Sequence, residues 1–197
     1  MNSNLKIILY SMPNWCSLIF KIEGTHEDIK QFYIDNKYNK GEIKDEDVSL
    51  EDKKFEYLDY SLTLSKLIPM PDHIYKGSIG IEERKKYGSN NWYDWSIKNW
   101  GTKWDARDCY IVNHEELDSK YTNLEYHFLT AWSPPIPWID KIIKKYKNIK
   151  FNINCVEESY EFAFDLNSSE NGEYIINRYD PIERMWEEYD KTNLINF

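Results

Sequence analysis

The sequence is poor in positive charge, in alanine and in long apolar runs. Its 25 Lys and Arg residues stand against 34 Asp and Glu residues, which gives a net charge of −9. This balance argues against broad binding to duplex DNA or to an anionic membrane, because both need a positive footprint. No stretch approaches the roughly 20 apolar residues of a membrane span, and the apolar run at residues 7–10 is too short for a secretory leader. We therefore expect a cytoplasmic protein.

The sequence also lacks the residue patterns of common catalytic and metal sites. The four histidines follow no metal-binding spacing, so we expect no metal and no cofactor. The glycines at residues 77–80 lack the Lys and Ser/Thr of a phosphate-binding loop. The cysteines are three, far apart and without a paired spacing: Cys16, Cys109 and Cys155. An unpaired set of this kind indicates reduced thiols in the core rather than disulfides or nucleophiles.

Aromatic residues are abundant. Hydrophobic residues make up 41% of the 197-residue chain and aromatic residues 16%, which excludes disorder throughout. The length is that of a single domain, which we place over residues 1–197. The frequent Lys, Asn, Ile and Tyr have AT-rich codons and reflect genome composition. The eight Trp residues have no such explanation, so the tryptophans are the feature to follow.

Hydrophobic periodicity predicts the elements of the fold. The predicted strands are residues 16–23, 58–67, 108–114, 124–130, 150–156, 160–166 and 174–179. The predicted helices are residues 25–36, 92–100, 137–146 and 181–191. The charged stretch 37–56 is expected to be a solvated acidic loop, or alternatively a negative patch that contacts a basic partner. Two strand–helix–strand units on one antiparallel sheet predict an α+β, ferredoxin-like sandwich, with an inserted Trp-rich helix-and-loop segment and an extra C-terminal helix.

Three Trp-bearing segments stand at the boundaries of these elements. They read Met-Pro-Asn-Trp-Cys at residues 12–16, Asn-Trp-Gly-Thr-Lys-Trp-Asp at 99–105 and Thr-Ala-Trp-Ser-Pro-Pro at 130–135. In this order they resemble a family of small proteins encoded by bacteriophages and conjugative plasmids. The resemblance implies a ferredoxin-like domain and carries no activity. Relatives begin at the Met-Pro pair, so residues 1–11 are expected to be an N-terminal extension, and residues 168–197 a C-terminal extension.

The residues near these motifs are the candidates for binding a ligand or a partner. They are Trp15, Trp100, Lys103, Trp104, Asp105, Arg107 and Trp132. Lys103, Asp105 and Arg107 either form a turn held by salt bridges or provide positive charge beside stacked indoles, where a nucleotide or a phosphorylated ligand could bind. The Trp residues can equally be structural, with each indole N–H bonded to a loop carbonyl.

These observations lead to two functional hypotheses. The first is an accessory protein of a mobile element, without catalytic activity, that binds a host protein with a basic surface in the bacterial cytosol. Such a protein can inhibit a host defence system such as restriction or CRISPR, because an acidic protein can occupy the basic nucleic-acid channel of the nuclease. The alternative is a domain, or an enzyme, that binds a nucleotide or another small ligand in a Trp-lined pocket. Direct binding to nucleic acid is not expected from the net charge of −9.

Overall fold

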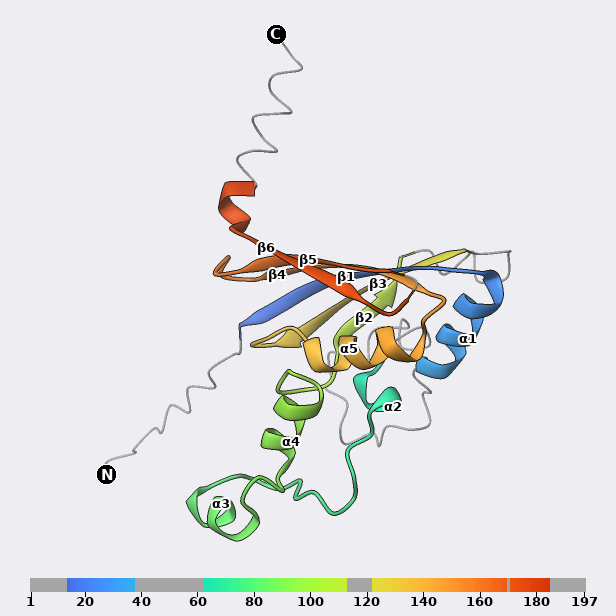
Figure 1. Cartoon of the computed structure of the whole chain (residues 1–197). Helices are drawn as coiled ribbons and strands as arrows, with labels where there is room; N and C mark the ends of the chain where they lie inside the picture. Colours follow the sequence, from blue (N-terminus) through green and yellow to red (C-terminus); the bar gives the residue numbers. More distant parts are fainter. Residues whose placement is uncertain (1–13, 38–61, 113–121, 170, 185–197) are drawn as a thin grey trace, which may run out of the picture.

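The computed structural model describes residues 14–37, 62–112, 122–169 and 171–184. Its strands are β1 (Trp15–Glu23), β2 (Arg107–Ile111), β3 (Asn123–Ala131), β4 (Lys150–Glu157), β5 (Ala163–Ser168) and β6 (Tyr174–Tyr179). Its helices are α1 (His26–Asn36), α2 (Leu64–Leu67), α3 (Ile81–Tyr87), α4 (Trp92–Asn99) and α5 (Ile136–Lys145). Figure 1 shows these helices on one side of the sheet, with α3 at the far end of a projecting segment.

The strands form one sheet in the order β2-β3-β1-β4-β5-β6, and each neighbouring pair is antiparallel. The four strands β2-β3-β1-β4, with α1 after β1 and α5 between β3 and β4, have the ferredoxin-like arrangement. The hairpin of β5 and β6 extends the sheet beyond β4 (Figure 1). The predicted fold class, an α+β ferredoxin-like domain with an antiparallel sheet, is confirmed.

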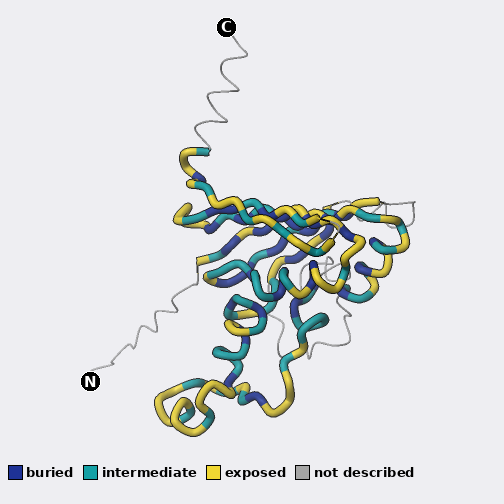
Figure 2. The backbone as a smooth tube through the Cα atoms, in the orientation of Figure 1, coloured by how far each residue is buried: buried dark blue, intermediate teal, exposed yellow. Residues whose placement is uncertain are grey.

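The core lies between the sheet and the helices α1 and α5. Along β1 every second side chain is fully buried, in agreement with the alternation in the sequence. Trp138, Ile139, Ile142 and Ile143 form the buried face of α5. Thr25 caps α1, because its hydroxyl oxygen accepts a hydrogen bond from the backbone N–H of Asp28 at 3.2 Å. Figure 2 shows the buried residues along these elements, whereas the segment around α3 is mostly exposed.

Among the described residues, no helix has the length and apolar character for crossing a membrane.

The predicted strand at residues 58–67 is wrong over its last residues. Leu62 forms only an isolated bridge with Lys37, and Leu64–Leu67 is the short helix α2. The strand that completes the first split βαβ unit is instead β2, which comes much later in the chain. One further expectation is corrected, and one helix is new. Residues 160–162 lie outside β5, since Tyr160 turns the chain with φ +60°, and the sequence did not predict α3.

Several predicted segments lie wholly or partly outside the described residues. The extension at residues 1–11 does so, as do residues 38–56 of the acidic loop. Within the predicted C-terminal extension, residues 174–179 form β6 as expected, and residues 181–184 are helical at the start of the predicted last helix. The remainder of that helix, from residue 185, is again outside the described residues.

Candidate binding surface

The three Trp-bearing segments meet at one end of the sheet, where β1 begins and β3 ends. The backbone N–H of Trp132 donates to the carbonyl of Asn14 at 2.8 Å, which joins the first segment to the third. The Thr102 hydroxyl donates to the carbonyl of Ala131 at 2.9 Å. The Ser133 hydroxyl donates to the carbonyl of Gly101 at 2.6 Å, so the second segment is tied to the third twice. The order of motifs in the sequence therefore corresponds to one place in the fold.

Two backbone conformations shape this junction. Gly101 has φ +89°, and a Cβ on this residue would lie 2.3 Å from Cδ of Pro137. Only glycine satisfies both the dihedral angle and the close approach to α5. Trp132 has φ +69°, an uncommon value for a residue with a side chain. This conformation is held by the hydrogen bond from its own N–H to Asn14.

The junction carries alternating rings and cations. We use the name Trp–cation surface for Trp15, Lys103, Trp104, Arg107 and Trp132. The ammonium nitrogen of Lys103 lies 4.3 Å from the ring centroid of Trp104 and 4.2 Å from that of Trp132. The rings of Trp15 and Trp104 are 6.0 Å apart, and the Arg107 guanidinium carbon lies 5.7 Å from the Trp15 ring. These distances are in the range of attractive cation–π and tilted aromatic contacts.

The indoles of this surface are partly open to solvent. Trp104 is 36% exposed and Trp132 is 40% exposed, whereas Trp138 in the core is completely buried. The exposed rings are therefore not part of a closed core. Lys103 forms no ion pair with any acidic residue in the ranges that the structure describes. The two indoles position its ammonium, which can receive an anionic group from a partner.

The arrangement continues onto α4 through residues that the sequence reasoning missed. The Tyr93 ring lies edge-on to Trp132, with 6.3 Å between centroids. The Arg84 guanidinium lies 5.9 Å from the centre of the Tyr93 ring and 3.7 Å from a carboxylate oxygen of Asp94. The aromatic residues of the predicted helix 92–100 were the available signal, but no pattern showed which of them faces Trp132.

Trp100 is not part of the exposed surface. It is 6% exposed, and its indole N–H donates to the carbonyl of Ile68 at 2.9 Å. Its ring packs edge-on against Trp95, with 5.3 Å between centroids. This is the structural role that the sequence allowed for a boundary tryptophan, and it holds α4 against the segment after α2.

Asp105 anchors α2 instead of forming a salt-linked turn. Its carboxylate accepts hydrogen bonds from the backbone N–H groups of Leu64 at 2.6 Å, Ser65 at 3.2 Å and Ala106 at 2.8 Å. Burial raises the pKa of the Asp105 carboxyl, and the hydrogen bonds from Ser65 and Leu64 oppose this rise. The side chain that follows Trp104 thus fixes the Trp-rich loop to the start of a distant helix.

The cysteines behave as core thiols. Cys16, Cys109 and Cys155 are all buried and free. Burial raises the pKa of the Cys109 thiol to about 12, and its sulfur accepts a hydrogen bond from the Leu62 backbone N–H. A thiol in this environment is unreactive at neutral pH. Across the described ranges, no group of three or more His, Cys, Asp or Glu side chains is placed to hold a metal ion.

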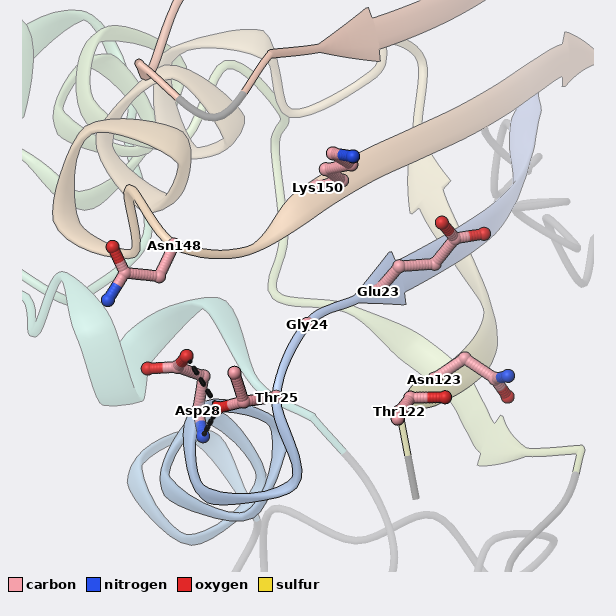
Figure 3. Close-up of a pocket in the computed structure, with 8 residues that line it drawn as sticks. All are labelled: Glu23, Gly24, Thr25, Asp28, Thr122, Asn123, Asn148 and Lys150. Carbon is pink, nitrogen blue, oxygen red and sulfur yellow. Dashed lines mark hydrogen bonds between the residues drawn. The ribbon is translucent and has the colours of Figure 1, made fainter.

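A separate depression of about 680 Å³ lies at the opposite end of β1. Its lining is Glu23, Gly24, Thr25, Asp28, Thr122, Asn123, Asn148 and Lys150 (Figure 3). Thr25 and Asp28 bond to each other there as the cap of α1, as the dashed lines show. None of the residues of the Trp–cation surface lines this depression.

Residues 99–195 match the family model of the ferredoxin-like domain in Api92-like protein. The match begins at the second Trp-bearing segment, includes the third, and extends through β6. It supports a ferredoxin-like family for this part of the chain, in agreement with the observed sheet. No curated protein and no solved structure matches the chain.

Proposed function

We propose that this protein acts by binding another protein through the Trp–cation surface. The observation that supports the proposal is that Trp104 and Trp132 are held in place by Lys103 and by the loop hydrogen bonds, yet remain more than one-third exposed. Trp, Tyr and Arg are the residues that most often dominate the energy of protein–protein interfaces. Because these rings are positioned before binding, little conformational entropy is lost when a partner covers them.

We further propose that the partner is a host protein with a basic surface, and that the chain is an accessory protein of a mobile element. Two observations support this version. The Trp-bearing segments resemble those of phage and plasmid proteins, and the net charge of −9 attracts a basic partner over long range. Restriction and CRISPR nucleases contain basic channels, so inhibition of such a nuclease is the specific activity to test. At short range Lys103 is placed to receive an acidic group of the partner.

The second candidate is a site for a nucleotide or another small anionic ligand. It is favoured by the ammonium of Lys103, which lies between two indoles as a phosphate-binding cation would. It is disfavoured because Lys103 already covers one face of Trp104 and one face of Trp132. A base would have to stack on the faces that remain.

Affinity capture tests the first candidate. The tagged full chain is incubated with lysate of the bacterial host, and the retained proteins are compared with those retained by Trp104→Ala and Trp132→Ala variants. Ile81→Ser is the matched control, because Ile81 is 76% exposed on α3 and belongs to no part of the surface. A partner kept by the control and lost by both Trp variants supports the proposal, and inhibition of that partner's nuclease activity supports the anti-defence version. If the wild-type chain and all three variants retain the same proteins equally, the proposal that the Trp–cation surface binds a partner is contradicted.

A thermal-shift screen separates the second candidate from the first. Mononucleotides and cyclic dinucleotides are added to the wild-type chain and to Lys103→Met. A rise in melting temperature that disappears in Lys103→Met indicates the small-ligand site.

A further inference from the structure

A second group of polar side chains lies on the face of the sheet that α1 to α5 leave uncovered. Tyr110 on β2 bonds to His127 on β3, with 3.1 Å between the hydroxyl oxygen and Nδ1. His127 bonds in turn to Glu125, with 2.6 Å between Nε2 and Oε1. The Lys21 ammonium lies 3.2 Å from the other oxygen of Glu125. A hydroxyl, an imidazole and a carboxylate are thus connected in series.

The backbone register produces this alignment. Glu125 and His127 are two residues apart on β3, so their side chains point to the same face of the sheet. Tyr110 is the cross-strand partner of His127 on the edge strand β2. A bulge lies between Arg107 and Tyr110, and Asp108 within it has φ +49°. Since Arg107 pairs with Leu129, the bulge brings Arg107 and Tyr110 to neighbouring positions of the same face.

The hydrogen bonds orient these side chains. Burial raises the pKa of Glu125, but the hydrogen bonds from His127 and Lys21 and the charge of Lys21 outweigh it and lower the pKa overall. Glu125 is therefore ionised at neutral pH and can only accept. Nε2 of His127 donates to this carboxylate, and in the tautomer that leaves Nδ1 without a proton, Nδ1 accepts the hydrogen bond of the Tyr110 hydroxyl. This is the orientation of a general base directed at a nucleophile.

We propose that Tyr110 is a nucleophile for phosphoryl transfer from an activated anionic phosphoester, with His127 as its general base. The phenolic oxygen forms the new P–O bond while its proton passes to Nδ1 of His127. The bond from phosphorus to the leaving oxygen breaks, and that oxygen departs with the electron pair. Glu125 holds the imidazole and stabilises the imidazolium that forms. Arg107 is the neighbouring cation on this face, and a guanidinium is well matched to phosphate oxygens.

Tyr160 provides an internal reference for the experiment. Tyr110 is 45% exposed and Tyr160 is 54% exposed, so both phenols are open to a reagent, and the described residues place no imidazole on the Tyr160 hydroxyl. The full-length chain is treated with two probes, an aryl sulfonyl fluoride and bis(4-nitrophenyl) phosphate. Peptide mass spectrometry gives the labelling rate at each tyrosine, and absorbance follows the release of nitrophenolate.

Because a positioned general base contributes about 10²–10⁴ in rate, we expect Tyr110 to be labelled at least about tenfold faster than Tyr160 with both probes. His127→Gln keeps a side chain that can hydrogen-bond to both neighbours but cannot take the proton. In this variant the labelling rate of Tyr110 should fall close to that of Tyr160. Tyr110→Phe should abolish the nitrophenolate burst, and circular dichroism verifies that both variants are folded.

Two results would overturn the proposal. Equal labelling of Tyr110 and Tyr160 by the sulfonyl fluoride in the wild-type chain refutes an activated nucleophile. Selective sulfonylation of Tyr110 without any phosphodiester adduct refutes phosphoryl transfer as the reaction class. Loss of protein capture in the Trp104→Ala variant has no bearing on either result, because Trp104 is not part of the relay.

Discussion

Replacement of Trp104 by alanine should lower stability only modestly. The substitution removes the ring contact with Trp15 at 6.0 Å, which contributes about 0.5–1.5 kcal/mol for an aromatic pair. It also removes one of the two cation–π contacts of Lys103, worth about 0.5–1 kcal/mol at an exposed site. These two contacts together contribute about 1–2.5 kcal/mol, and the ring also buries apolar area, but less than a core tryptophan because Trp104 is 36% exposed. The decrease in the free energy of unfolding should therefore be smaller than that of a core truncation.

The matched comparison is Trp138→Ala. Trp138 is completely buried, and its indole N–H donates to the carbonyl of Leu64 at 3.1 Å. Truncation of a buried aromatic side chain costs about 3–5 kcal/mol, and the unpaired carbonyl adds to this cost.

Urea unfolding followed by far-ultraviolet circular dichroism gives both values without relying on Trp fluorescence. If Trp104→Ala lost as much stability as Trp138→Ala, the exposed tryptophans would be structural. The reasoning behind the Trp–cation surface would then be refuted.

Substitutions at three further positions test the contacts that shape the surface and the relay. Gly101→Ala should destabilise the protein by about 1–3 kcal/mol in urea unfolding, because the new Cβ meets Pro137 and φ is +89°; no change would mean that this loop relaxes freely. Asp105→Ala should cost about 1–2 kcal/mol through loss of the cap of α2, and Asp105→Asn should cost less, since its amide oxygen still accepts; equal losses would contradict capping. The pKa of Glu125 is lowered in the folded state, so its contribution to stability is present above the ordinary value of 4.5 and is lost as pH falls through the folded value. Glu125→Gln should therefore lower the melting temperature at pH 7 and leave it nearly unchanged at pH 3; an equal decrease at both pH values would contradict this linkage.

The parts of the fold that follow from local pattern were predictable from the sequence. In β1 the alternation of apolar residues matches the buried face residue for residue. The helices predicted at 137–146 and 25–36 match α5 and α1 to within one residue at each end. Each of these signals depends only on neighbours in the sequence.

The parts set by distant contacts were not predictable in the same way. The alternation of apolar residues from Leu58 to Leu64 is typical of a strand, but Leu64–Leu67 forms a helix. Asp105, about 40 residues later, stabilises its start by accepting the N–H groups of Leu64 and Ser65. The same holds for the candidate site. The sequence singled out Trp15, Trp104 and Trp132, but the register of β1 and β3 and the hydrogen bonds of Thr102 and Ser133 bring them together. Tyr110 and His127 carried no signal, since a bulge in β2 decides which face Tyr110 occupies.

The most direct test of the account is the affinity of the captured host protein for the wild-type chain and three variants, measured by surface plasmon resonance. The account predicts that Trp104→Ala and Trp132→Ala each weaken binding at least about tenfold, as is usual when a central interface tryptophan is truncated. Ile81→Ser should bind like the wild-type chain. A partner that binds both Trp variants with unchanged affinity would contradict the claim that the exposed tryptophans form the binding surface.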